Sequence, residues 1–234
     1  LALKKEGFHI CIDTSGVGKD YLKLIDLVDL FIVDVKSLYP EEYKYWGIDS
    51  EESRMFELTE NEVLLNLGGC CGDTVFQYLK GNYPFKKIIT VEGDETTAEY
   101  LKRSINLLED SVREKIQIDC CFVGAGENSI DNKYADEKIT IINMDIEGVE
   151  LEVLQTGINV IKRDRPVLAI CAYHKKEDLI ELPKFVMDNF ENYVITIRKY
   201  PSFYWNEFDG IQQINELVMY AIPVERYVQN CTYK

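Results

Sequence analysis

The sequence predicts an α/β fold in which helices cover both faces of a mostly parallel, seven-stranded sheet. From residue 62 onward, short runs of β-branched and apolar residues alternate with segments that repeat apolar residues at helical spacing. This alternation is typical of parallel sheets, because each crossover helix packs on one face of the sheet. A chain of 234 residues with 46% hydrophobic content can also bury the core that such a fold needs.

Seven segments are expected to form strands, and four are expected to form helices. The strands are predicted at residues 62–67, 87–92, 115–120, 138–144, 166–171, 193–198 and 216–222. The helices are predicted at residues 73–81, 96–108, 149–164 and 177–190. No long helical pattern separates the last two strands, so they are expected to pair antiparallel at one edge of the sheet.

The chain is expected to divide into a short β/α appendage, residues 1–45, and a main domain, residues 46–234. Near residues 39–54, aromatic and acidic residues replace the periodic pattern. Two strands and one helix cannot bury both faces of a sheet, so the appendage is expected to dock on the main domain or on another partner.

Composition argues against several classes of partner. The net charge of −15 disfavours nucleic acid and anionic membranes, since both repel an acidic surface. No run approaches the roughly 20 apolar residues of a membrane span. The seven cysteines include no CxxC pair, and we interpret them as reduced, mostly buried thiols of a cytoplasmic protein.

A glycine-rich turn follows the first strand of the main domain. In "LLNLGGCCGDT", Gly68, Gly69 and Gly72 come after the strand, and Asp73 and Thr74 are placed to cap the next helix. Glycine permits a tight turn and lets a ligand approach the main chain. The alternative is a turn that only packs a helix on a strand.

Acidic residues in two further segments strengthen the interpretation of this turn as a ligand site. Glu92 ends the next strand about 20 residues beyond the glycines, where an acid can accept both hydroxyls of a ribose; a solvated acid is the alternative. In "INMDIEGVELEVL", Asp145 and Glu147 follow a strand directly, and a carboxylate there could take a proton from a hydroxyl or hold a substrate or a metal. The helix macrodipole explains Glu150, at the start of the next helix, but not Asp145.

Four segments together resemble an FkbM-type methyltransferase over about residues 41–224. They are "NEVLLNLGGCCGDT", "VEGD", "INMDIEGVELEVL" and "RPVLAICAYHKKEDLIELP". The resemblance implies a Rossmann-like class I methyltransferase fold with S-adenosyl-L-methionine as the cofactor. It also implies methyl transfer, typically to a hydroxyl of a small-molecule acceptor such as a sugar or natural product.

The resemblance assigns roles to residues of these motifs. Asp145, Glu147 and His174 would be the catalytic groups, with Tyr173 and His174 closing the site from the next strand. Histidine titrates near neutrality, which suits a general base, and a surface histidine is the alternative. No metal site is predicted. The cofactor would be bound by Asn66, Gly68, Gly69, Gly72, Asp73, Thr74, Glu92 and Asp145.

The chain departs from the family pattern at three places. Asn66 stands where an acid is usual, so a hydrogen bond to the cofactor's amino group would lose its charge assistance. Gly93 stands where a proline is usual, and the segment between Cys121 and Lys138 is shorter than usual. These departures support a second hypothesis, in which the domain is a degenerate, non-catalytic binding or interaction domain.

Residues 1–45 resemble an internal fragment of a glycyl-radical-enzyme activase, which is a radical S-adenosylmethionine enzyme. Asp13 of "DTSG" and Asp34 of "DVK" match strand-end motifs of that family. Its iron–sulfur cluster needs three closely spaced cysteines, which this chain lacks, so radical chemistry by the chain alone is not expected. The segment would be a remnant fused to a methyltransferase or part of a longer protein.

An aromatic segment, "RKYPSFYWNEFDG" at residues 198–210, lies between the last two predicted strands. Aromatic faces suit stacking on a sugar, so this segment could cover an acceptor. An exposed hairpin extension or a dimer contact is the alternative.

Overall fold

The computed structural model describes residues 11–14, 30–33, 55–206 and 210–228. Its helices are α2 (Asp73–Lys80), α3 (Glu95–Ile105), α4 (Asp110–Arg113), α5 (Ile130–Lys133), α6 (Glu150–Gln155), α7 (Ile158–Asp164) and α8 (Asp178–Asn189), with a 3₁₀ turn, η4, at Gly126–Asn128. Its strands are β1 (Cys11–Thr14), β2 (Leu30–Val33), β3 (Val63–Leu67), β4 (Lys87–Glu92), β5 (Ile116–Cys120), β6 (Ile141–Met144), β7 (Val167–Cys171), β8 (Tyr193–Asn206) and β9 (Gly210–Pro223).

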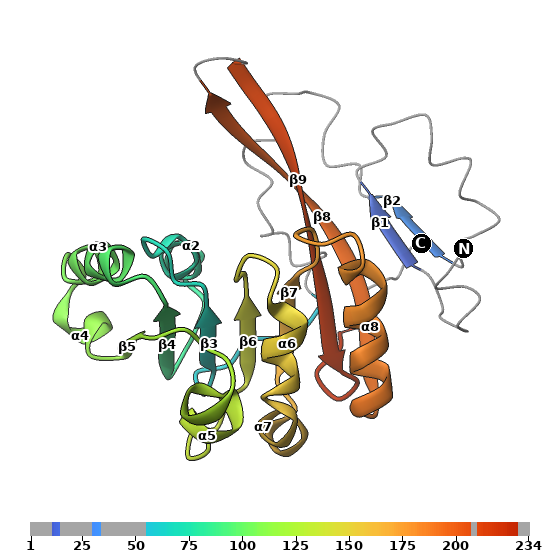
Figure 1. The fold of residues 1–234 in the computed structure, drawn as a ribbon, viewed down its shortest axis with the longest axis horizontal. Helices are drawn as coiled ribbons and strands as arrows, with labels where there is room; N and C mark the ends of the chain where they lie inside the picture. The colour runs from blue at the N-terminus through green and yellow to red at the C-terminus, as the bar shows by residue number, and fades with distance from the viewer. Residues whose placement is uncertain (1–10, 15–29, 34–54, 207–209, 229–234) are drawn as a thin grey trace.

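The described strands form one nine-stranded sheet in the order β2-β1-β8-β9-β7-β6-β3-β4-β5 (Figure 1). All seven predicted strands form, and the predicted α/β class is confirmed. Strand β3 pairs in parallel with both β4 and β6, so the sheet grows outward from β3 in two directions. This reversal makes the carboxyl end of β3 the topological switch point, where ligands bind in such sheets.

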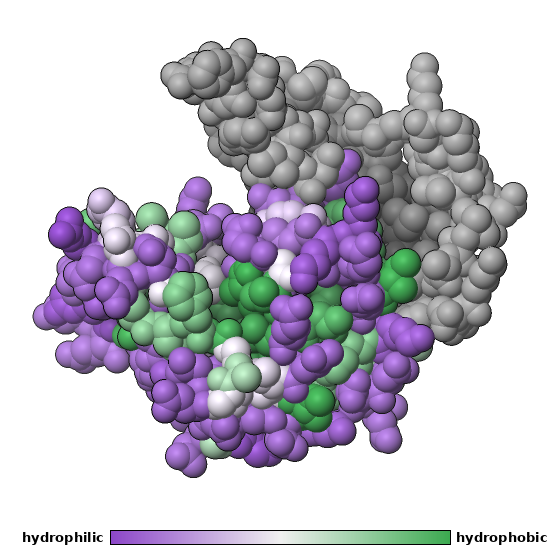
Figure 2. All heavy atoms as spheres, in the orientation of Figure 1, coloured by the Kyte–Doolittle hydropathy of each residue, from purple (hydrophilic) through white to green (hydrophobic). Residues whose placement is uncertain are grey.

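Residues of β3 alternate between two hydrophobic cores, one on each face of the sheet. Val63, Leu65 and Leu67 pack in the core beneath α5 to α8, whereas Leu64 packs in the core beneath α2 and α3. All five residues of the strand are buried, as a strand covered on both faces requires. Figure 2 shows that the visible surface of the described part is mostly hydrophilic, with hydrophobic residues gathered near the middle of the face. Among the described helices, none is long and apolar enough to cross a membrane.

The helix predicted over residues 149–164 is in fact two helices, α6 and α7. The Thr156 hydroxyl donates to the carbonyl of Val153 across 2.7 Å, which competes with the helical ladder at that turn. A Cβ atom at Gly157 would lie 3.1 Å from Ile130, so the chain bends where it passes close to α5. Apolar spacing does not reveal such a break, because both helices keep the same buried face.

Strands β8 and β9 pair antiparallel, as predicted, but β8 is not at the edge of the sheet. Strand β1 pairs in parallel with β8 through Ile12 and Ile197, and β2 lies beyond β1. The N-terminal strands therefore dock on the main sheet. The predicted boundary near residue 45, the helix between β1 and β2, and Asp34 lie outside the described residues, so the division into two domains stays a prediction.

The prediction that the cysteines are mostly buried is wrong for the described residues. Cys171, in β7, is buried, but Cys70, Cys71 and Cys120 are exposed and Cys121 is half-buried. These four cysteines lie where β3 and β5 end, and the chain turns there instead of continuing through the core. A neighbouring apolar run is consequently a poor guide to burial at a strand end.

Candidate active site

The registers of four parallel strands align the residues that follow them. Leu67 pairs with Val91 on one side and with Met144 on the other, and Met144 pairs with Ile170. The next position of each strand therefore falls on one row at the carboxyl edge. These positions are Gly68, Glu92, Asp145 and Cys171.

The glycines of the turn after β3 are required by contacts within the protein. Gly68 has φ +90°, and a Cβ there would lie 1.8 Å from the carbonyl oxygen of Asp145. A Cβ at Gly69 would lie 2.7 Å from the Thr90 hydroxyl. The missing side chain at Gly68 thus lets the backbone of the loop that carries Asp145 pack against the glycine turn.

Asp73 and Thr74 do not cap helix α2, contrary to the prediction. Gly72, with φ +99°, is the N-cap residue, and Asp73 is the first residue of the helix. A left-handed backbone favours glycine at that position, so the cap has no side chain to contribute. Asp73 instead places a negative charge at the positive end of the helix dipole.

Glu92 lies against the glycine turn. Its two carboxylate oxygens accept hydrogen bonds from the backbone N–H groups of Cys70, at 2.8 Å, and Asp94, at 2.9 Å. A carboxylate has about four acceptor positions, so this carboxylate keeps capacity for two further donors. The arrangement fits a group that holds a pair of hydroxyls beside the turn.

Phe122 is a further candidate site residue, which the sequence analysis did not identify. Its side chain is 76% exposed, and a Cβ at Gly93 would lie 2.4 Å from its ring. The missing side chain at Gly93, just after Glu92, is what lets the ring lie there. The signal in the sequence was the glycine in place of the usual proline.

Asn66 does not reach the edge of the sheet. It is fully buried; its amide donates to the Thr90 hydroxyl across 3.1 Å and accepts from the Asn143 amide across 2.8 Å. The three side chains form a polar ladder across β4, β3 and β6. This ladder already uses both ends of the Asn66 amide, so its predicted contact with the cofactor gains no support from the geometry.

His174 lies between carboxylates contributed by the β6–α6 loop. Its Nε2 is 3.3 Å from Asp145 Oδ1 and 3.7 Å from Glu147 Oε2, and its side chain is only 10% exposed. The alternative of a surface histidine therefore does not describe this residue. The Asp145 side chain is 42% exposed, so it is the member of the pair that solvent and ligands reach.

Glu150 is a second residue that sequence reasoning did not place in the site. Its side chain is fully buried, and Oε1 lies 2.8 Å from His174 Nδ1. The same oxygen accepts hydrogen bonds from the N–H groups of Ile146 and Gly148. Positive φ angles at Glu147 (59°) and Gly148 (95°) fold the loop back on itself and bring Glu150 inward.

Burial perturbs the acids of this cluster. Burial raises the pKa of Asp145 from its ordinary value, although the charge of His174 and a hydrogen bond from Tyr173 oppose the shift. The Tyr173 hydroxyl lies 3.3 and 3.4 Å from the two Asp145 oxygens. Burial, followed by the charge of Asp145, also raises the pKa of Tyr173 and of Cys171, so both stay protonated near neutrality.

The sheet order and the site at the switch point define a Rossmann-like methyltransferase fold. Residues 43–233 match the methyltransferase FkbM domain. The chain belongs to this FkbM methyltransferase family, which confirms the resemblance found in the motifs. The match begins at residue 43, so the resemblance of residues 1–45 to an activase stays a prediction.

Solved structures share the fold. A methyltransferase FkbM from Methylobacillus flagellatus KT is 22% identical with a TM-score of 0.59, covering 78% of this chain and 50% of that chain. This chain thus spans half the length of that relative. A precorrin 8W decarboxylase from Methanobacterium thermoautotrophicum is 11% identical with a TM-score of 0.50, covering 72% of this chain and 84% of that chain. No curated protein shows a significant match to the sequence.

Proposed function

We propose that this chain transfers a methyl group from S-adenosyl-L-methionine to a hydroxyl of a small-molecule acceptor, such as a sugar or natural product. The observation that carries the proposal is the cluster of Asp145, His174 and Glu150 beside the glycine turn at the switch point. The net charge of −15 supports a small acceptor over nucleic acid.

The residues beside the turn fit the adenosine part of the cofactor. Glu92 keeps acceptor capacity for the two ribose hydroxyls, and the exposed ring of Phe122 offers a face on which adenine would stack. When bound, S-adenosylmethionine would supply an electrophilic methyl group on its sulfonium.

Asp145 is the residue best placed to orient and deprotonate the acceptor. Its carboxylate is partly exposed. It accepts a hydrogen bond from the Tyr173 hydroxyl and lies within ion-pair distance of His174 Nε2. The raised pKa of Asp145 brings it closer to that of a useful general base.

Glu147, whose side chain is 92% exposed, would hold another hydroxyl of the acceptor. Alignment of the hydroxyl would supply most of the rate, because a sulfonium is already a reactive donor.

Calorimetric titration with S-adenosylmethionine and S-adenosylhomocysteine tests this proposal. Micromolar binding, on the order of −8 kcal/mol, is expected for the wild-type chain. Glu92→Gln and Phe122→Ala should each weaken it at least tenfold. The matched controls are Glu95→Gln, another acid of this segment, and Leu107→Ala, another exposed apolar residue.

Two outcomes would count against the proposal. If the folded wild-type chain binds neither compound, the non-catalytic binding domain becomes the better hypothesis. If the controls weaken binding as much as Glu92→Gln and Phe122→Ala do, the adenosine site lies elsewhere.

A further inference from the structure

The cluster around His174 contains buried polar atoms that make no hydrogen bond within the described part of the protein. Within the described residues, Glu150 Oε2 and His174 Nδ1 are both buried and make no hydrogen bond. The Nδ1 atom lies 2.8 Å from Glu150 Oε1, which is an ion-pair distance, but the contact does not have the geometry of a hydrogen bond. Because buried polar atoms are nearly always paired, two orphaned atoms on facing side chains indicate a missing ligand.

The charges of the cluster indicate the sign of that ligand. In the part of the chain that the structure describes, the ion pairs of Asp145 and Glu150 are both with His174. The nearby Lys175 pairs with Glu152 instead, at 3.6 Å. A fully buried carboxylate is costly unless a cation or several hydrogen bonds compensate it, and one imidazole cannot neutralise two carboxylates.

The donor set has the spacing of a metal site. One ligand atom from each of Asp145, Glu150 and His174 can be chosen so that all three lie within 4.8 Å of one another. The N–H groups of Ile146 and Gly148 occupy Glu150 Oε1, which leaves Oε2 as the free ligand atom. Carboxylate oxygens combined with one imidazole nitrogen suit first-row divalent ions such as Mn²⁺ or Zn²⁺.

We propose that Asp145, Glu150 and His174 bind one divalent transition-metal ion at the carboxyl edge of β6 and β7. Three protein ligands leave coordination positions open, so the ion would also contact the hydroxyl of an acceptor beside Asp145. This inference rests on the proposed function for its role in methyl transfer, but not for the binding of the ion itself.

Titration of the chelator-treated chain with Mn²⁺ tests the site directly. Loss of the electron paramagnetic resonance signal of free Mn²⁺ should report one ion per chain, and Zn²⁺ should displace it. Glu150→Gln and His174→Gln should each weaken binding at least tenfold. Glu152→Gln is the matched control, because Glu152 is an exposed acid of the same helix that lies outside the trio, and it should bind as the wild-type chain does.

Folding and cofactor binding are measured on the same samples. If Glu150→Gln does not fold, Asp145→Asn replaces it, since the Asp145 side chain is partly exposed. Binding of S-adenosylhomocysteine without any binding of Mn²⁺ or Zn²⁺ would overturn the metal site and leave the proposed function standing. Metal binding that Glu150→Gln and His174→Gln do not weaken would place the ion elsewhere and would equally overturn the proposal.

Discussion

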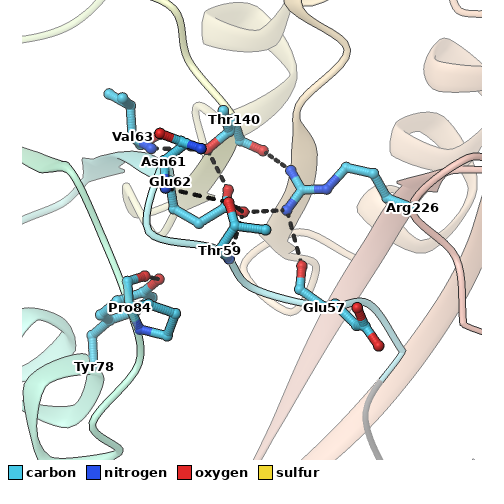
Figure 3. Close-up of polar contacts among 9 residues, drawn as sticks. All are labelled: Glu57, Thr59, Asn61, Glu62, Val63, Tyr78, Pro84, Thr140 and Arg226. Carbon is cyan, nitrogen blue, oxygen red and sulfur yellow. Dashed lines mark hydrogen bonds and ion pairs between the residues drawn. The ribbon is translucent and has the colours of Figure 1, made fainter.

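The guanidinium of Arg226 donates a hydrogen bond to the buried carboxylate of Glu62 across 3.0 Å, so the segment after β9 is tied to the residue before β3 (Figure 3). Arg226 also donates to the carbonyl oxygens of Thr140, at 2.7 Å, and Glu57, at 3.3 Å. Glu62 in turn accepts hydrogen bonds from Thr59 and Thr140. One ion pair therefore fastens the amino ends of β3 and β6, opposite the site.

Replacing Arg226 with methionine should destabilise the fold by about 3–5 kcal/mol, because it leaves the Glu62 carboxylate buried without its cation. Urea unfolding measures the loss. Arg113→Met is the control: it breaks an exposed pair with Asp110, and it should cost less than about 1 kcal/mol. If the two variants lose the same free energy of unfolding, the buried ion pair stabilises the fold no more than the exposed pair does.

Gly68→Ala should destabilise the fold by more than about 4 kcal/mol, since the new Cβ would collide with the carbonyl oxygen of Asp145 and φ is +90°. Gly124→Ala, where a Cβ would meet nothing within 4 Å, should change stability by no more than about 0.5 kcal/mol. Thermal unfolding of the two variants checks the contrast. A stable Gly68→Ala chain would contradict the close approach of the two loops.

Asp164→Asn should reduce stability at neutral pH and flatten its dependence on pH. Burial would raise the pKa of Asp164, but hydrogen bonds from Arg163, Lys138 and the backbone N–H of Ile139 outweigh burial and lower it. A lowered pKa gives stability that is present above the ordinary carboxyl pKa, about 4, and is lost as the pH falls through the folded value. Melting temperatures at pH 7 and pH 3 measure the effect.

The variant should therefore differ from the wild-type chain at pH 7 and approach it at pH 3. Asp188 is exposed, so Asp188→Asn should leave the wild-type curve unchanged. A constant difference between Asp164→Asn and the wild-type chain at all pH values would rule out the ion-pair explanation.

Tyr173→Phe should move the titration of Asp145 to higher pH. The Tyr173 hydroxyl stabilises the ionised carboxylate, so its removal raises a pKa that burial has already raised. Carbon-13 NMR of the carboxyl groups of the metal-free chain, assigned with Asp145→Asn, follows the midpoint. A midpoint that stays in place or moves down would contradict the role of the hydroxyl.

Patterns within single segments predicted the strands and the carboxyl edge. A short run of apolar residues located β3, and the parallel class then placed Gly68, Glu92 and Asp145 at one edge of the sheet. His174 followed from the family motif. These predictions succeed because strand period and parallel pairing together determine which side chains share an edge.

The parts that sequence reasoning missed depend on backbone angles and on contacts between segments. Glu150 reads as an ordinary acid at a helix start until the left-handed residues Glu147 and Gly148 turn it inward. Phe122 matters only because Gly93, from another loop, leaves room for its ring. The predicted capping roles of Asp73 and Thr74 were wrong because the helix begins at Asp73 itself, with the left-handed Gly72 as its N-cap residue.

The pairing of β1 with β8 joins Ile12 to Ile197, which are 185 positions apart in a chain of 234 residues. Contacts of such sequence separation form late in folding, whereas the β8–β9 hairpin, closed between Asn206 and Gly210, can form locally. On the ribosome, β1 emerges long before β8 and must remain without that partner while the main sheet is synthesised. The first strands of the chain can therefore join the main sheet only after β8 has been synthesised.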